Sequence, residues 1–281
     1  MLESVVTSLS SFLRIGIASN GISLLRSSGW TQRTHQILAE ESIANGGTLT
    51  QVQLAALLEK LIQAANCDGL NTEFILADEL VRLFMVTPPL NCSRLDDCRA
   101  AAHMRFQALY GEGAKDWYIE AEWDPQFPFL ACAMPRALRA DLLKITQTHH
   151  LTIKSLLPNF ISTWNRWHRQ LISDAWFGMV INKNMTLAIV DQGRLCGVRT
   201  APLPDQAWSD PQWLPDYVSR EALRMNVPAI TTLQVSGSFP AHWIDNKVGP
   251  VNCIKLDGNQ PAAVAEGQSV SLFLAQSGLK I

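Results

Sequence analysis

The segment from Arg14 to Leu25, RIGIASNGISLL, places a Ser-Asn-Gly turn between two runs of strand-forming residues. Asn20-Gly21 favours the positive φ angles of a tight type I′ hairpin turn. The backbone amides of such a turn, from Ser19 to Gly21, can also donate hydrogen bonds to a phosphate. The segment therefore has two interpretations, a plain β-hairpin and a phosphate-binding loop.

Other residues with reactive side chains are better explained by structural roles. Cys92, Cys98 and His103 lie in one short segment, but a Cys-x5-Cys spacing is wider than is typical of zinc sites. Asp96 suits the first turn of a helix, and His149-His150 suits the end of one. The chain contains no Gly-x-Ser-x-Gly element for nucleophilic catalysis. We predict no catalytic residue and no metal site.

Composition favours a folded globular protein, because hydrophobic residues make up 47% of the 281-residue chain and charged residues 17%. The formal net charge is −2 and the basic residues are scattered, which argues against a nucleic-acid partner. No apolar run reaches the length of a transmembrane helix, so we expect no direct insertion into a membrane. The six cysteines, with no secretory signal ahead of them, indicate reduced thiols and a cytoplasmic location.

A β-β-β-α-β order occurs twice along the chain. Three short strands are expected within 13–43, then a helix that begins at the capping pair Thr50 and Gln53, then a strand in 71–77. The segment 176–202 again predicts three strands, with turns at Lys183-Asn184 and Gln192-Gly193, before a helix and a fourth strand. Each half therefore predicts a mixed sheet with a three-stranded meander and flanking helices.

The first half also contains helices without a counterpart in the second. One is expected from Ser93, as its N-cap, to Tyr110. Its apolar face would contain Leu95, Cys98, Ala102, Phe106 and Leu109. We place a first domain at 1–173, with a small inserted subdomain at about 86–130, and a second domain at 174–281. The role of 258–281, with its strand-like segment SVSLFLA, is left open.

The duplicated pattern resembles the actin-like ATPase superfamily, whose domains are RNase H-like. The segment from Glu79 to Arg166 is similar to the PilM and GspL branch, which serves type IV pilus assembly and type II secretion. The similar features are Pro88-Pro89 after a strand, Phe106 and Tyr110 near a helix end, Ala133-Met134-Pro135-Arg136, and Leu156-Leu157-Pro158 before a helix. The resemblance implies an α/β fold of two tandem actin-like domains with a small inserted subdomain.

The same resemblance places nucleotide loops in this sequence, but their characteristic residues are missing. Ala18 stands where the first loop has Asp, and Ile181-Asn182 stands where the second has Asp and Gly. Phosphoryl transfer needs a carboxylate near Mg²⁺, so we expect no cofactor and no catalysis, with weak ATP binding left open. The degenerate nucleotide-binding residues would be Ser19, Asn20, Gly21, Ser236 and Gly237.

The resemblance implies a non-catalytic scaffold, a pseudo-ATPase, of a type IV pilus or type II secretion-like assembly, peripheral to the inner membrane. Its partner would be the cytoplasmic segment of an inner-membrane pilus or secretion protein. That segment would bind a groove between the 93–110 helix and its sheet, through Leu95, Arg99, Phe106 and Tyr110.

Two alternatives to the scaffold stay open. One is an active ATPase or small-molecule kinase of the same fold that uses relocated acids such as Asp78 or Asp191. The other is an unrelated α/β binding protein whose repeated pattern is coincidental.

Overall fold

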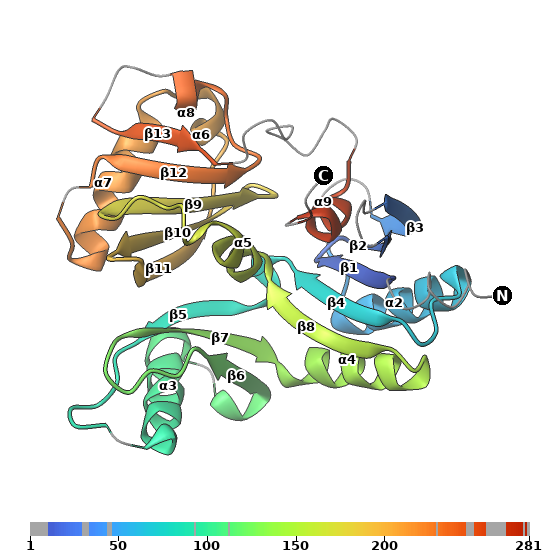
Figure 1. Ribbon diagram of the computed structural model, residues 1–281. Coiled ribbons are helices and arrows are strands. Elements are labelled where there is room, and N and C mark those ends of the chain that lie inside the picture. Colours follow the sequence, from blue (N-terminus) through green and yellow to red (C-terminus); the bar gives the residue numbers. More distant parts are fainter. Residues whose placement is uncertain are drawn as a thin grey trace. The chain divides into compact units, whose positions relative to one another are not determined.

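The computed structural model describes residues 11–29, 34–43, 47–92, 94–111, 113–228, 230–245, 250–256, 268–277 and 279. The chain forms two compact units (Figure 1). Unit 1 takes its residues from Met1–Val81, Met134–Thr163 and Gly267–Ile281, and unit 2 from Arg82–Ala133 and Trp164–Glu266. Each unit contains a five-stranded mixed sheet.

The sheet of unit 1 has the strand order β3-β2-β1-β4-β8. The antiparallel meander consists of β1 (Phe12–Ala18), β2 (Gly21–Ser28) and β3 (Thr34–Ser42), and the parallel strands are β4 (Asn71–Leu76) and β8 (Thr152–Pro158). In Figure 1, α2 (Gln51–Ala65) and α4 (Arg136–Thr148) cover one face of this sheet and α9 (Val270–Gln276) covers the other. The expected meander, helix and fourth strand are confirmed.

Helix α2 begins and ends where local chemistry predicts. The Thr50 hydroxyl accepts a hydrogen bond from the Gln53 amide, and the Thr50 amide donates to the Gln53 side chain at 2.8 Å, which completes a capping box. The helix ends at Asn66, in the left-handed conformation. Its buried face consists of Leu54, Leu58, Leu61 and Ile62.

The C-terminal segment SVSLFLA forms helix α9, so its strand-like interpretation was wrong. Ser269 caps the helix by accepting from the Leu272 amide at 3.1 Å. The helix lies so close to β1 that a Cβ on Gly16 would collide with the carbonyl oxygen of Ser271. Arg14, buried in β1, pairs with Glu73 at 3.3 Å and donates to the carbonyl oxygen of Ser277. Tertiary packing, not local periodicity, therefore determines the conformation of this segment.

The second sheet has the order β11-β10-β9-β12-β13 and repeats the same design. Its meander consists of β9 (Ala175–Ile181), β10 (Asn184–Asp191) and β11 (Arg194–Pro202), and its parallel strands are β12 (Thr232–Gly237) and β13 (Asn252–Lys255). The turn at Gln192-Gly193 lies where the sequence predicts it, whereas the other turn lies at Asn182-Lys183, one residue earlier than expected. Both turns have two successive left-handed residues, as type I′ hairpins require.

An aromatic cluster fills the core of the second sheet. The helices on it are α6 (Gln206–Ser209), α7 (Trp213–Met225) and α8 (His242–Asp245). The Trp213 ring stacks on Tyr217, with centroids 4.6 Å apart, and on Trp243, with centroids 6.1 Å apart. Trp213 and Trp243 are 7% and 2% exposed, so these two tryptophans are core residues.

The inserted segment of unit 2 is a three-stranded sheet with one covering helix. The strand order is β5-β7-β6, with β5 (Arg82–Val86), β6 (Trp117–Ala121) and β7 (Phe129–Pro135). Helix α3 (Leu95–Tyr110) has Arg94 at its N-cap position without a side-chain cap, and its expected cap, Ser93, lies outside the described residues. It ends at Gly111, as predicted, in the left-handed conformation. The described residues also contain the short helices η1 (Asp78–Leu80), η2 (Ala114–Asp116) and α5 (Asn159–Trp167).

Among the described residues, none of the helices combines the length and the hydropathy of a bilayer-spanning segment.

The contact between α9 and β1 predicts the effect of a small substitution. Gly16→Ala should lower the free energy of unfolding by about 1–3 kcal/mol, because the added methyl collides with the backbone of α9. Gly113→Ala is the matched control, since its Cβ would lie 3.7 Å from the nearest side-chain carbon of Lys115, an ordinary contact. Urea unfolding followed by tryptophan fluorescence measures both. Equal stability of the two variants would contradict the packing described for α9.

Candidate functional site

The first candidate loop is the two-residue turn Ser19-Asn20 between β1 and β2. Ala18 pairs with Gly21 across the hairpin, and neither turn residue has a positive φ. The type I′ turn predicted at Asn20-Gly21 is therefore wrong. Gly21 is the first residue of β2, and a Cβ there would lie 2.7 Å from the carbonyl oxygen of Glu41. The close approach of β3, not the geometry of the turn, requires this glycine.

Polar groups of Ser19 and the carbonyl oxygen of Asn20 are hydrogen-bonded within unit 1, whereas Asn20 Oδ1 is buried without a hydrogen-bond partner among the described residues. The hydroxyl of Ser19 donates to the Glu79 carboxylate at 2.5 Å, and the Ser19 amide donates to the same oxygen at 3.4 Å. The carbonyl oxygen of Ser19 accepts from the amide of Leu49, and that of Asn20 accepts from the amide of Ile43, both at 2.7 Å. The loop thus faces a carboxylate, whose charge opposes the approach of a phosphate.

Asp78, one of the two relocated acids considered from the sequence, holds the start of a helix. Its carboxylate accepts a hydrogen bond from the backbone amide of Phe160, the second residue of α5, at 2.9 Å. Amides in the first turn of a helix have no partner within the helix, so a carboxylate there stabilises it.

The second candidate loop, Asn182-Lys183, presents a cation. The Lys183 ammonium lies 2.7 Å from the Asp205 carboxylate, and both side chains are exposed. Asp191, the other relocated acid, ends β10, whose first residue follows this loop. At the rise of an extended strand, the eight residues of β10 separate Asp191 from the loop by roughly 23 Å. Asp191 therefore does not contribute to this loop.

The third candidate loop follows β12. Gly237 has a φ of 96° and pairs with Val180 of β9, so close that a Cβ would collide with the Val180 carbonyl oxygen. The amide of Ser238 donates to that same oxygen at 2.8 Å. Ser236 is buried within the sheet. The close pairing of β12 with β9 therefore explains why position 237 is a glycine, without any need for a bound phosphate.

Comparisons with known proteins identify the fold. No protein-family model matches the chain, and no curated protein matches its sequence. A protein of unknown function with an actin-like ATPase fold from Bacteroides thetaiotaomicron matches with a TM-score of 0.62 and 10% identity, over 95% of both chains. This chain has an actin-like ATPase fold.

Two further matches come from pilus and secretion systems. The PilM-PilN type IV pilus biogenesis complex gives a TM-score of 0.61 at 12% identity, over 97% of this chain and 99% of that chain. The cytoplasmic domain of EpsL, an inner-membrane component of the type II secretion system of Vibrio cholerae, gives 0.55 at 11% identity, over 97% of both. The resemblance predicted from the sequence is confirmed for the fold, and the alternative of an unrelated fold is wrong.

The inserted subdomain of this actin-like fold contains the residues predicted to bind a partner. Phe106 is fully buried, with its ring centroid 5.8 Å from that of Phe84 and 5.3 Å from that of Trp117. The Tyr110 hydroxyl donates to the backbone carbonyl of Leu83 at 3.3 Å. These side chains fill the space between α3 and its sheet with core, so that space is not an open groove.

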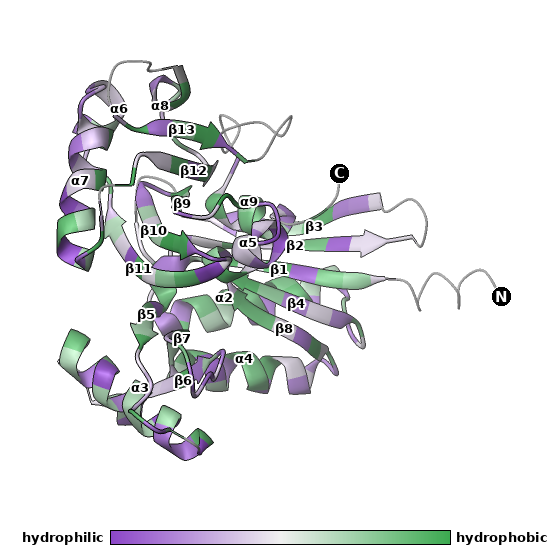
Figure 2. Cartoon of the chain, turned by 60° about the vertical axis from the view of Figure 1, so that its left-hand side comes forward, coloured by the Kyte–Doolittle hydropathy of each residue, from purple (hydrophilic) through white to green (hydrophobic). Residues whose placement is uncertain are grey.

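Two of the predicted partner residues lie on the surface. Leu95 is 46% exposed at the start of α3, and Arg99 pairs with Asp96 at 3.2 Å. Figure 2 shows hydrophilic and hydrophobic residues alternating along α3, as a helix with one buried face should. An exposed surface at the start of α3, centred on Leu95 and Arg99, is what remains of the predicted site.

The described residues contain no cluster of three or more histidine, cysteine or acidic side chains that could hold a metal. Cys98 is 1% exposed in the core of the inserted subdomain, which agrees with its interpretation as a small buried hydrophobe. His149 Nδ1 lies 2.9 Å from the Asp68 carboxylate after the end of α4.

The hydrogen bond from Phe160 to Asp78 predicts a change in stability. Asp78→Ala should lower the free energy of unfolding by about 1 kcal/mol, because the start of α5 loses its acceptor. Asp78→Asn is the matched control, since an amide oxygen can still accept, and it should recover most of the loss. Urea unfolding distinguishes the two variants. If both lose the same free energy of unfolding, the charge of Asp78, and not its hydrogen bond, stabilises the start of α5.

Proposed function

We propose that this chain is a non-catalytic scaffold with an actin-like fold in a type IV pilus or type II secretion-like assembly. It would bind the cytoplasmic segment of an inner-membrane protein and thereby be held at the cytoplasmic side of that membrane. The observation that carries the non-catalytic part is the pair of hydrogen bonds from Ser19 to the Glu79 carboxylate. The likeness in fold to the EpsL cytoplasmic domain and to the PilM-PilN complex supports the biological setting.

Electrostatics supports the loss of nucleotide chemistry. Like charges 4 Å apart near a protein surface repel each other by about 4 kcal/mol, so the Glu79 carboxylate disfavours a phosphate at the Ser19 amide. Ala18, at the end of β1, offers no oxygen to a magnesium ion. The loop therefore presents a charge that opposes the phosphate and lacks the carboxylate expected to hold the metal.

One observation favours the second candidate, an active ATPase or small-molecule kinase. Glu79 is an acid within reach of the first loop, and a carboxylate there is a possible magnesium ligand. In that case Glu79 would turn from Ser19 toward the metal when nucleotide binds, and turnover would depend on its charge.

Nucleotide titration distinguishes the two candidates. The scaffold predicts no phosphate release from Mg-ATP by the wild-type protein or by Glu79→Gln, in which the side chain still accepts from Ser19 but carries no charge. Any weak ATP binding should tighten in Glu79→Gln, since the repulsion is removed. Calorimetry and a phosphate-release assay on the same samples measure both quantities. Turnover by the wild-type protein that Glu79→Gln abolishes would overturn the scaffold and establish the enzyme.

The partner is tested at the exposed surface at the start of α3. Photo-crosslinking from position 95 in cells, followed by mass spectrometry, should capture an inner-membrane protein, whose cytoplasmic segment is then titrated as a synthetic peptide. Leu95→Asp should lower the affinity for that peptide roughly tenfold or more, because the substitution removes apolar contact and places a charge at the binding surface. Leu223→Asp, at an 82% exposed leucine of α7, is the matched control and should bind normally. Equal affinity of the two variants would exclude this surface, and a captured protein without a membrane span would contradict the proposed partner.

A further inference from the structure

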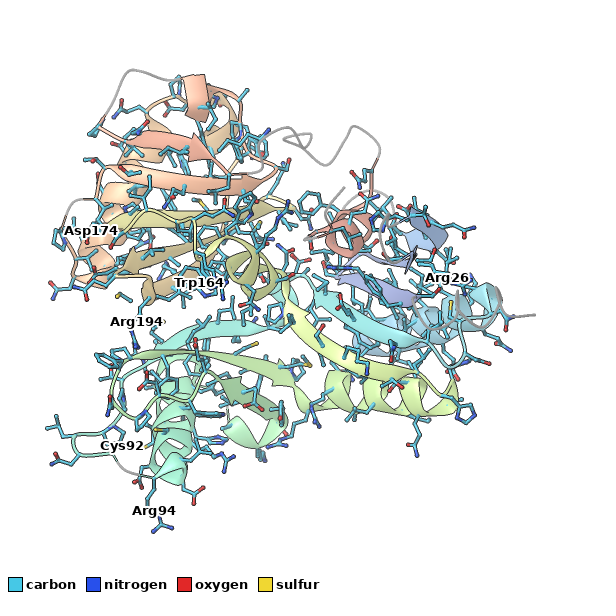
Figure 3. All side chains as sticks on the ribbon, in the orientation of Figure 1. Arg26, Cys92, Arg94, Trp164, Asp174 and Arg194 are labelled. Atoms are coloured by element: carbon cyan, nitrogen blue, oxygen red, sulfur yellow. The ribbon has the colours of Figure 1, made fainter. Side chains whose placement is uncertain are left out.

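Two thiols of the inserted subdomain lie next to each other. The Sγ atoms of Cys92 and Cys98 are 3.2 Å apart, and both cysteines are free. Cys92 lies in the loop between β5 and α3, where Figure 3 labels it, and Cys98 lies near the start of α3. The sequence spacing gave no reason to pair them, but the fold brings them into contact.

The two thiols differ in accessibility. Cys98 is 1% exposed, and burial, with the neighbouring Cys92 sulfur as the next cause, raises the pKa of its thiol to about 11. Cys98 is therefore protonated at neutral pH and a poor first nucleophile. Cys92 is half-buried and lies outside any helix or strand, so it is the more accessible of the two thiols.

We infer that Cys92 and Cys98 are a redox modification site, at which a low-molecular-weight disulfide such as oxidised glutathione produces a reversible intramolecular disulfide. The Cys92 thiolate attacks one sulfur of the oxidant, which forms a mixed disulfide and releases one thiol. Cys98 then loses its proton to the solvent and attacks Cys92 Sγ, which forms the protein disulfide and expels the second glutathione as a thiolate; both expelled thiolates take up the protons that the two cysteines lost. The two protein thiols are oxidised as the small disulfide is reduced to two thiols, and excess reduced thiol reverses the reaction.

Formation of the disulfide bond requires little movement of the two cysteines. The sulfur atoms must approach by about 1.2 Å to reach the length of a disulfide bond. Cys98 is held in a helix, so the movement falls on Cys92, which lies outside any helix or strand. The bond would tie that loop to α3 and so restrict Leu90, which is 96% exposed on the same loop. This inference is independent of the scaffold proposal, because it needs no partner and no nucleotide.

Digestion with trypsin allows the disulfide bond to be detected as a pair of linked peptides. Cleavage after Arg94 and Arg99 separates Cys92, in LFMVTPPLNCSR, from Cys98, in LDDCR, so that only a disulfide keeps the two peptides together. The full-length protein is equilibrated with glutathione buffers of increasing oxidised fraction, quenched with iodoacetamide, digested without reductant and analysed by mass spectrometry. We expect the linked pair of peptides, in protein that still runs as a monomer on a non-reducing gel.

Cys196, an exposed thiol, is the internal control. At a fixed concentration of reduced glutathione, Cys92 and Cys98 should link at roughly tenfold less oxidised glutathione than Cys196 needs to form its mixed disulfide, because the second step is intramolecular. In Cys98→Ser, Cys92 should accumulate as a glutathione adduct. In Cys92→Ser, which changes a half-buried residue at the edge of the core, Cys98 should stay reduced.

Three results would overturn the inference. The first is a wild-type protein whose Cys92 carries glutathione at every ratio without linked peptides. The second is a linked pair that occurs only in disulfide-bonded dimers. The third is oxidation of Cys98 in Cys92→Ser to the same extent as Cys196.

Discussion

The turn that follows β4 is the constraint on which the first loop and the start of α5 both depend. Strand β4 pairs in parallel with β1 and with β8, so the ends of three strands meet at one edge of the sheet. There Ala77 donates to the carbonyl oxygen of Ile17 at 2.8 Å, Asp78 accepts from Phe160, and Glu79 accepts from Ser19. Three successive residues thereby connect β1, the first hairpin and α5. The acidic residues of this edge have structural hydrogen bonds before any ligand is considered.

The two hairpins of the repeat share their position but not their chemistry. The first turn has negative φ angles and faces a carboxylate, whereas the second has two left-handed residues and presents Lys183. The glycines that suggest a nucleotide site, Gly21 and Gly237, are each explained by a neighbouring strand that leaves no room for a Cβ. A glycine at a strand end is thus weak support for a phosphate loop unless the surrounding backbone is free to receive one.

The sequence predicts those parts of the fold that depend on local patterns. Alternating strands, the capping box at Thr50 and the order of the elements predicted the two meanders, and the actin-like fold followed from the resemblance of that order to a known superfamily. The failures came from tertiary contacts: SVSLFLA alternates like a strand but becomes helical on β1, and Phe106 lies on an apolar face that the core fills. Glu79 had no local signal, because it meets Ser19 across 60 residues of sequence. The position of the first hairpin could therefore be predicted from the sequence, but its hydrogen bonds to the Glu79 carboxylate could not.

At 10–12% identity to proteins of the same fold, what this chain retains is a pattern of backbone pairing. A ligand that binds only the folded state stabilises that state. A loop that evolved to hold a ligand therefore contains polar groups whose hydrogen-bond partners belong to the ligand. In this chain the amide and hydroxyl of Ser19 and the carbonyl oxygens of the first turn already have protein partners. Apart from Asn20 Oδ1, which is buried without a partner in the described part of the chain, these groups of the first loop are hydrogen-bonded without a phosphate. An actin-like fold that satisfies its first loop in this way can keep the shape of that loop without a nucleotide.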